Sequence, residues 1–107
     1  MNISKFVSQQ TTASLDLIPA ESIRLFQNYP NPFYPSTTIT YDLSKSGNVT
    51  LKIFDNSGRE LETLLRRFES AGEHQLEWSP IGLPGGLYFY QLQGDTFTET
   101  KKLILQK

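Results

Sequence analysis

Short runs in which apolar and polar residues alternate, bounded by turn-forming residues, dominate this sequence. In residues 37–43, Thr-Thr-Ile-Thr-Tyr-Asp-Leu, every second position from Ile39 is apolar, so Ile39, Tyr41 and Leu43 would lie on one side of an extended chain. Residues 49–53 repeat the pattern with valine, leucine and isoleucine. A period of two residues is that of a β-strand with one buried face. These runs therefore predict antiparallel sheets that place one face in a core.

Five further segments complete the expected set of strands. They are residues 23–27, 59–69, 74–78, 87–92 and 97–105. In the second of these, the leucines fit both helical and strand spacing, but no helix-capping signal precedes them, so we predict a strand. Because no helices separate the strands, a parallel βαβ arrangement is disfavoured. About seven short strands predict an all-β, immunoglobulin-like antiparallel β-sandwich over residues 21–107.

Large apolar side chains must hold this sandwich together without covalent help. The chain has no cysteine, so no disulfide can join the two sheets. Trp78 shares a strand face with His74 and Leu76 and is expected to fill the centre of the sandwich. Residues 87–92 are apolar or aromatic with little alternation, which is typical of a strand covered on both faces. Four tyrosines are expected to carry much of the remaining packing: Tyr29, Tyr41, Tyr88 and Tyr90.

Residues 28–36 interrupt the strands with three prolines, Pro30, Pro32 and Pro35. Proline has no backbone N–H for a sheet ladder, and it pushes the preceding residue toward extended geometry. We therefore expect a stiff crossover from one sheet to the other, with Tyr29 and Phe33 as anchors in the core. The alternative is a proline-rich ligand for an SH3- or WW-like groove. The crossover is favoured because expected strands flank the segment on both sides.

A corner and a hairpin follow near the C-terminal end of the sequence. Pro84 fixes its own φ angle, and Gly85 and Gly86 permit backbone angles closed to other residues. A tight corner is therefore expected to lead directly into the strand 87–92. A Gly-Asp turn then brings the closing strand, residues 97–105, back antiparallel beside it.

The charge balance and the apolar pattern exclude several classes of partner. The formal net charge is −1, so no basic field draws in nucleic acid and no polybasic stretch binds anionic lipid. No apolar run is long enough for membrane insertion. Residues 1–20 are rich in serine, threonine and glutamine without a sustained period, and we interpret them as a flexible linker or an added leader. They do not show the pattern of a signal peptide.

The residue types needed for catalysis are nearly absent. His74 is the only histidine, no Gly-x-Ser-x-Gly elbow is present, and a histidine on a leucine and tryptophan face is typically a packing residue. Asp55-Asn56-Ser57-Gly58 lacks the ligand spacing of a calcium loop, so we predict a turn and no metal site. We expect no enzyme activity and no cofactor. The abundant aromatic residues leave a carbohydrate-binding or spacer module open as an alternative function.

Several motifs resemble, in order and spacing, the C-terminal sorting domains of the type IX (Por) secretion system, type A. The first is Tyr29-Pro30-Asn31-Pro32-Phe33, followed by Pro35-Ser36-Thr37-Thr38-Ile39. The later ones are residues 49–55, 58–61 and 71–74, the corner Pro84-x-Gly86-x-Tyr88, and the closing stretch 101–107. The family's terminal signature is often Lys-x-x-x-Lys, whereas Lys102 and Lys107 stand one residue further apart.

This resemblance implies a seven-stranded domain that acts as an address on a larger secreted protein, whose N-terminal cargo domain is missing from this chain. It implies that the cargo crosses the inner membrane by an ordinary signal, and that the outer-membrane type IX translocon then recognises the domain. A sortase-like peptidase would cut in the linker ahead of the domain. The expected location is secreted or on the cell surface of a Gram-negative bacterium, reached through the periplasm.

A recognition surface is expected where the corner meets the end of the closing strand. Lys101, Lys102 and Lys107 are expected to point outward while leucines between them anchor the strand. The predicted translocon-facing site combines these lysines with Pro84, Gly86 and Tyr88. For Gly86 and Tyr88, a role in folding alone is the alternative. The predicted structural motif comprises Pro30, Asn31, Pro32, Phe33 and Trp78.

Overall fold

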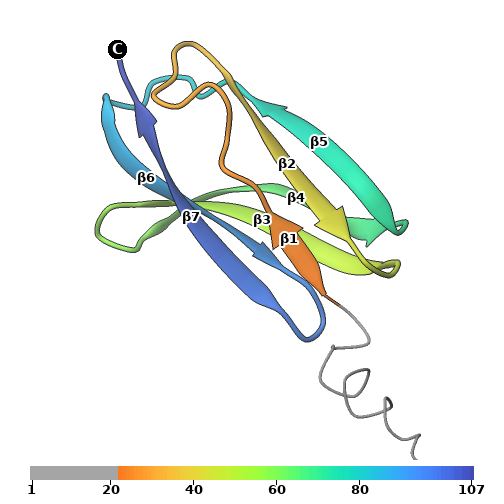
Figure 1. Ribbon diagram of the computed structural model, residues 1–107. Coiled ribbons are helices and arrows are strands. Elements are labelled where there is room, and N and C mark those ends of the chain that lie inside the picture. The colour runs from red at the N-terminus through yellow and green to blue at the C-terminus, as the bar shows by residue number, and fades with distance from the viewer. Residues whose placement is uncertain (1–21) are drawn as a thin grey trace, which may run out of the picture.

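The computed structural model describes residues 22–107, which form seven strands and no helix (Figure 1). The strands are β1 (Ile23–Leu25), β2 (Thr37–Leu43), β3 (Gly47–Asp55), β4 (Glu60–Glu69), β5 (Gly72–Trp78), β6 (Gly86–Gln93) and β7 (Thr98–Leu105). Each paired set of strands is antiparallel. The prediction of seven strands is confirmed. The expected linker, residues 1–20, lies outside the described residues.

The strands form two sheets that enclose one core. One sheet has the order β1-β2-β5 and the other the order β4-β3-β6-β7. In immunoglobulin-like domains the first, second and fifth strands likewise share one sheet, and the third, sixth and seventh share the other. Here β4 extends the second sheet at its edge. The predicted immunoglobulin-like antiparallel β-sandwich is confirmed.

Alternation in the sequence sets which face of each central strand is buried. On β2, every second residue from Thr37 to Leu43 is buried, and on β3 Val49, Leu51 and Ile53 are buried while their neighbours are not. Successive side chains of a strand point to opposite faces, so this pattern follows from the backbone once the apolar face meets the other sheet. The predicted inward positions of both strands are confirmed.

β4 is the strand whose sequence also fits a helix, and two β-bulges explain why. Opposite β3, the register skips one residue between Glu60 and Glu62 and another between Thr63 and Leu65. The extra residues are Leu61 and Leu64, which are half-buried against the core. A bulge adds a residue and shifts the inward phase of a strand. The leucines therefore recur at spacings of three and one residues although the chain is extended.

β6 differs from the expectation of a strand covered on both faces. Tyr88, Tyr90 and Leu92 are buried, but Leu87 on the opposite face is 37% exposed and Phe89 is half-buried. The outer face of the sheet carries no covering layer within the described residues. The prediction that residues 87–92 are covered on both faces is therefore wrong for this chain alone. Its apolar outer positions remain available to solvent.

The proline-rich segment begins and ends in the same sheet, so the prediction of a crossover between sheets is wrong. It joins β1 to its neighbour β2, and on the way Phe33 forms a bridge to Leu105 of β7 in the other sheet. Phe33 is 2% exposed, which confirms it as an anchor. Tyr29 is 80% exposed, so its predicted burial is wrong. Strand alternation places Asn28 inward and therefore turns Tyr29 outward.

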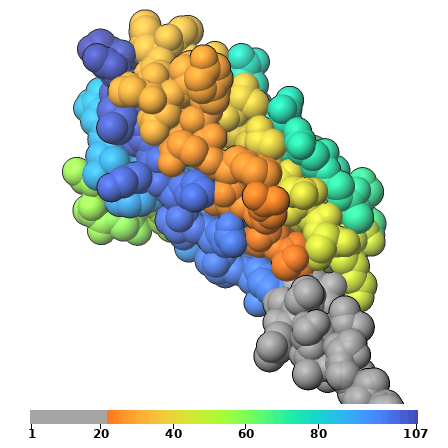
Figure 2. Space-filling view, viewed as in Figure 1, coloured from red at the N-terminus to blue at the C-terminus, as the bar shows by residue number. Residues whose placement is uncertain are grey.

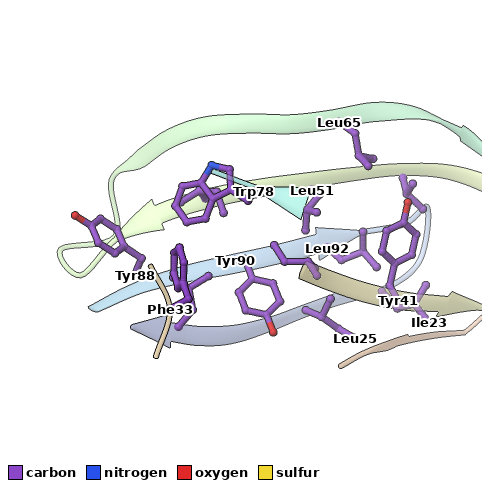
Figure 3. Packing of buried hydrophobic residues seen from close by; sticks show 14 of the residues in the cluster. Ile23, Leu25, Phe33, Tyr41, Leu51, Leu65, Trp78, Tyr88, Tyr90 and Leu92 are labelled. Atoms are coloured by element: carbon purple, nitrogen blue, oxygen red, sulfur yellow. The ribbon is translucent and has the colours of Figure 1, made fainter. Parts of the chain in front are cut away.

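Aromatic side chains fill the core, although Trp78 is not at its centre. Trp78 is the last residue of β5 and packs against Phe33 with ring centroids 5.8 Å apart. Figure 3 shows Trp78, Phe33 and Tyr88 together at one end of the core, with Tyr90 between them and Tyr41. The burial of Trp78 is confirmed, and its central position is wrong because β5 ends there.

Candidate functional site

The corner before β6 packs closely against the end of β7. In the β6–β7 hairpin, Gly86 lies opposite Leu105. A Cβ atom on Gly85 would stand 3.1 Å from the Leu105 carbonyl oxygen and 3.4 Å from the Lys107 nitrogen, so only glycine fits without displacing the backbone. Gly86 has a φ angle of 153°, a backbone conformation that residues other than glycine rarely adopt. The paired glycines thus permit the contact between corner and closing strand.

Two side chains tie this corner to the rest of the domain. The Tyr88 hydroxyl donates to the Pro84 carbonyl oxygen at 2.5 Å, while its ring is buried. The Lys107 Nζ donates to the Leu83 carbonyl oxygen at 2.7 Å. Of the predicted site residues, Tyr88 therefore contributes mainly to the core, and the Lys107 ammonium group holds the corner.

The three lysines do not share one face of the closing strand. Buried Leu103 and Leu105 define the inner face of β7, and alternation puts Lys101 on that same face and Lys102 on the outer face. Lys101 is half-buried beside β1, where it lines a groove with Glu99 and Arg24. The prediction that all three lysines point outward is therefore wrong for Lys101.

The free edge of β7 is closed by residues from the segment that follows β1, which we call the edge clasp (Gln27, Asn31 and Phe33). The Ile104 amide donates to Asn31 Oδ1 at 2.9 Å, and the Ile104 carbonyl accepts from the Phe33 amide at 2.9 Å. The Gln106 amide donates to the Phe33 carbonyl at 2.9 Å. Gln27 Nε2 donates to the Lys102 carbonyl at 2.8 Å.

The edge clasp satisfies backbone groups that an edge strand would otherwise present to another chain. Figure 2 shows the orange segment after β1 lying against the blue terminal strand. The sequence predicts a structural role for the Pro-Asn-Pro-Phe motif, and in the structure Asn31 and Phe33 of this motif bind the edge of β7. The role of Gln27 was not foreseen, because its partner lies 75 residues away in the sequence.

A buried polar node anchors the start of the edge clasp to β6. The Tyr90 hydroxyl donates to the Phe26 carbonyl at 2.6 Å and accepts from the Asn28 amide at 2.9 Å. Asn28 is 2% exposed, and its Nδ2 donates to the Thr37 hydroxyl oxygen at 2.9 Å. Burial raises the pKa of Tyr90 to about 12, so the hydroxyl keeps the proton that it donates.

The carboxylate of the acidic turn after β3 is hydrogen-bonded by residues of the same turn. Asp55 Oδ1 accepts from the Ser57 amide and hydroxyl and from the Arg59 amide, at 2.9, 2.6 and 2.9 Å. The Ser57 hydroxyl and the Arg59 amide lower the pKa of Asp55 to about 2. The turn and the corner line an open hollow of about 290 Å³. Within residues 22–107, no cluster of three or more histidine or acidic side chains could hold a metal ion.

His74 takes part in a polar network that joins the two sheets. The Tyr41 hydroxyl of β2 donates to Glu69 Oε2 of β4 at 2.8 Å, and Arg67 Nε donates to the same oxygen at 3.0 Å. His74 stacks on Tyr41 with centroids 5.4 Å apart, and its Nε2 lies 2.7 Å from the Ser70 carbonyl. Partial burial opposes ionisation, but the hydrogen bonds from Tyr41 and Arg67 keep the pKa of Glu69 below its usual value.

Burial and bonding in this network match a structural role for His74. Its neighbours in the described part of the chain are a tyrosine ring, a carboxylate and a backbone carbonyl, and no nucleophilic side chain among residues 22–107 is hydrogen-bonded to it. No helix among residues 22–107 is long and apolar enough to cross a membrane.

Comparison with known proteins identifies the family. Residues 27–106 match the family described as secretion system C-terminal sorting domain. No curated protein sequence matches the chain significantly. Among solved structures, the crystal structure of dimeric latent PorU from Porphyromonas gingivalis is similar, with a TM-score of 0.65 and 19% sequence identity over 82% of this chain.

The likeness to PorU concerns the fold alone, because the identity is low and this chain spans about a tenth (10%) of the PorU chain. The family match covers the proline motif, the corner and all but the last residue of the closing stretch. The chain belongs to the family of secretion system C-terminal sorting domains, which address proteins to the type IX secretion pathway.

Proposed function

We propose that this domain is the address of a longer secreted protein and is read at the end where the corner meets the closing strand. The outer-membrane translocon of the type IX pathway would bind this end after the cargo has crossed the inner membrane. The predicted site residues that are exposed there are Pro84, Gly86, Lys102 and Lys107, whereas Tyr88 is buried and supports the corner, and Lys101 is half-buried on the inner face of β7 beside β1.

The observation that carries this proposal is the family match together with a C-terminal end that is hydrogen-bonded to other segments of the domain. The corner, β7 and the edge clasp are held by hydrogen bonds from three separate parts of the chain. β1, which follows residues 1–21, starts at the opposite end of the sandwich from Lys107 (Figure 1). A cargo attached ahead of β1 would therefore leave the proposed reading end unobstructed.

Three finer features belong to the same proposal. The domain would have no catalytic activity of its own, and a sortase-like peptidase would cut ahead of it. The cargo would reach the surface of a Gram-negative bacterium by way of the periplasm. The motif pattern supports type A among the sorting domains, since it follows that subgroup from Tyr29 to the closing stretch.

The test is a secretion assay with a periplasmic reporter that carries its own inner-membrane signal. One fusion bears residues 1–107 at its C-terminus, and the matched fusion ends at residue 21. In a bacterium with the type IX pathway, we expect only the first reporter at the surface, and neither in a strain without the translocon. Retention of both reporters in the periplasm, with capture of the domain on polysaccharide, would support a carbohydrate-binding or spacer module instead.

A further inference from the structure

The outer face of the β4-β3-β6-β7 sheet divides into an apolar part and a polar part. Near the corner, Leu87 lies opposite Ile104, and the adjacent row places Phe54 opposite Phe89. Leu87 and Phe89 are two residues apart on β6 and share its outer face, so the four side chains are contiguous. Leu87 and Ile104 are 37% and 42% exposed. We call this group of four residues the outer patch.

Further along the same face, the residues are those of an ordinary solvent-facing sheet. The next rows run Lys52, Gln91, Thr100 and then Thr50, Gln93, Thr98. An antiparallel sheet with one face in water is expected to be polar on that face. The outer patch is the contiguous apolar group on this face and lies beside the corner, at the proposed reading end, whereas exposed Phe68 stands opposite Asn48 at the far end of the sheet.

The outer patch includes outward-facing residues of β6, the strand that the sequence predicts to be covered on both faces. Residues 87–92 have the composition of a strand buried on both faces, yet only the inner face meets the core. The sandwich provides no layer over Leu87 and Phe89, so any surface that covers them would come from outside residues 22–107.

The edge clasp restricts how a partner can approach. Backbone groups of residues 102–106 at the edge of β7 are already bonded to Gln27, Asn31 and Phe33. A partner cannot add a strand there without first breaking these bonds. The outer face of the β6–β7 hairpin offers side chains without that cost, so it is the more accessible surface.

The lysines near the outer patch differ in whether their ammonium groups have a partner. Lys102 lies opposite Phe89 at the border of the outer patch, and among the described residues its ammonium group has no ion-pair or hydrogen-bond partner. The Lys107 ammonium group instead binds the Leu83 carbonyl. Lys52, on the same face, pairs with Glu60 at 3.2 Å. Lys102 is therefore the cation at this border that is available to a partner.

We propose that the outer patch and Lys102 form the docking surface for a protein of the secretion machinery that presents apolar side chains beside a carboxylate. This inference rests on the proposed sorting function and specifies the surface that is read. Four side chains and one charge make a small contact compared with the roughly 20–30 residues a side of a stable interface, which suits a transient receptor better than a permanent second copy. Lys102 supplies the charge complementarity.

The test uses the reporter fusion with residues 1–107. The double substitution Leu87→Thr with Ile104→Thr places a residue of high β-propensity at both positions but removes exposed apolar surface, and we expect surface export to fall about tenfold or more. Lys102→Glu should lower export about fivefold or more because it reverses the complementary charge. Lys101→Glu makes the same charge change one residue away on the opposite face and should leave export unchanged.

Circular dichroism and thermal unfolding of each purified chain separate docking from folding. If the double variant does not fold, the comparison of Lys101→Glu with Lys102→Glu decides the question. Unchanged export for Lys102→Glu, or an equal loss for both lysine variants, overturns the outer patch while the parent fusion still supports sorting. Loss of export for the parent fusion overturns both proposals.

Two binding measurements address other occupants of the outer patch. Sedimentation of the purified chain 1–107 should show a monomer, and a dimer abolished by the double substitution would assign the patch to a second copy. Flotation with vesicles of phosphatidylethanolamine and phosphatidylglycerol should show no binding. Binding that requires Leu87 and Ile104 would assign the patch to a lipid surface. Either of these results overturns the proposed protein partner.

Discussion

Replacement of Tyr90 by phenylalanine tests whether the polar node under the edge clasp stabilises the domain. The substitution keeps the buried ring and removes only the hydroxyl, which donates to the Phe26 carbonyl at 2.6 Å and accepts from the Asn28 amide at 2.9 Å. Its effect on the free energy of unfolding therefore reports on hydrogen bonding rather than on packing.

The expected magnitude follows from the burial of the two backbone groups. Asn28 is 2% exposed, so its amide would lose its partner without access to water, at about 1–3 kcal/mol. The Phe26 carbonyl is less deeply buried and would add up to about 1 kcal/mol. Together, Tyr90→Phe should lower the free energy of unfolding by about 1–4 kcal/mol, against the 5–15 kcal/mol typical of small domains.

Urea unfolding followed by tryptophan fluorescence measures this change directly. Trp78 is the only tryptophan and is 4% exposed, so its emission reports on the opening of the core. With a urea dependence typical of small domains, the midpoint should fall by about 1–3 M for Tyr90→Phe.

Two other tyrosines provide matched controls. Tyr88→Phe removes a single hydrogen bond to the Pro84 carbonyl and should cost about 1 kcal/mol. Tyr29→Phe changes a side chain that is 80% exposed and should alter stability by less than about 0.5 kcal/mol. If Tyr90→Phe proves no more destabilising than Tyr88→Phe, the node does not hold the segment as argued.

Three further predictions concern the closing strand and the acidic turn. Asn31→Ala removes the acceptor for the Ile104 amide and should speed its hydrogen exchange about fivefold, whereas Asn31→Asp should not; equal rates would refute the clasp. Gly85→Ala places a Cβ 3.1 Å from the Leu105 carbonyl and should lower stability by about 1–2 kcal/mol in urea unfolding, and a stabilised variant would contradict this. The folded pKa of Asp55, about 2, lies below the ordinary 3.8, so its stabilisation is complete above about pH 4 and disappears as the pH falls toward 2. Urea midpoints measured across this range should show weaker acid destabilisation in Asp55→Asn, and an unchanged pH profile would contradict the assignment.

Several features of the fold could be predicted because they depend on neighbours along the chain. Alternation in β2 and β3 identified the buried face of each strand, and the sequence motifs identified the family. The ambiguity of β4 was resolved correctly as a strand, although the bulges at Leu61 and Leu64 could not be foreseen. A bulge is defined by the register with a partner strand, and a single strand's sequence does not contain that register.

The placement of the candidate site was only partly predictable for the same reason. The sequence identifies the corner and the closing lysines, but the expectation that Lys101 and Lys102 both point outward conflicts with the two-residue period of a strand. The sequence predicts Tyr29 as a core anchor, whereas in the structure Asn28 and Tyr90 form the buried contact. Polar residues whose hydrogen-bond partners lie on distant strands give no periodic signal, so the sequence does not predict the roles of Gln27 and Asn28.

The sequence by itself therefore determined the strands, their inward faces and the family, because a two-residue period and short turn motifs act over a few neighbouring positions. Only the tertiary structure decided that Asn31 and Phe33 close the edge of β7, that the two sheets leave Leu87 and Ile104 uncovered, and which lysine lies beside them. These properties arise from contacts between residues up to 75 positions apart, which exist only after the two sheets have packed together.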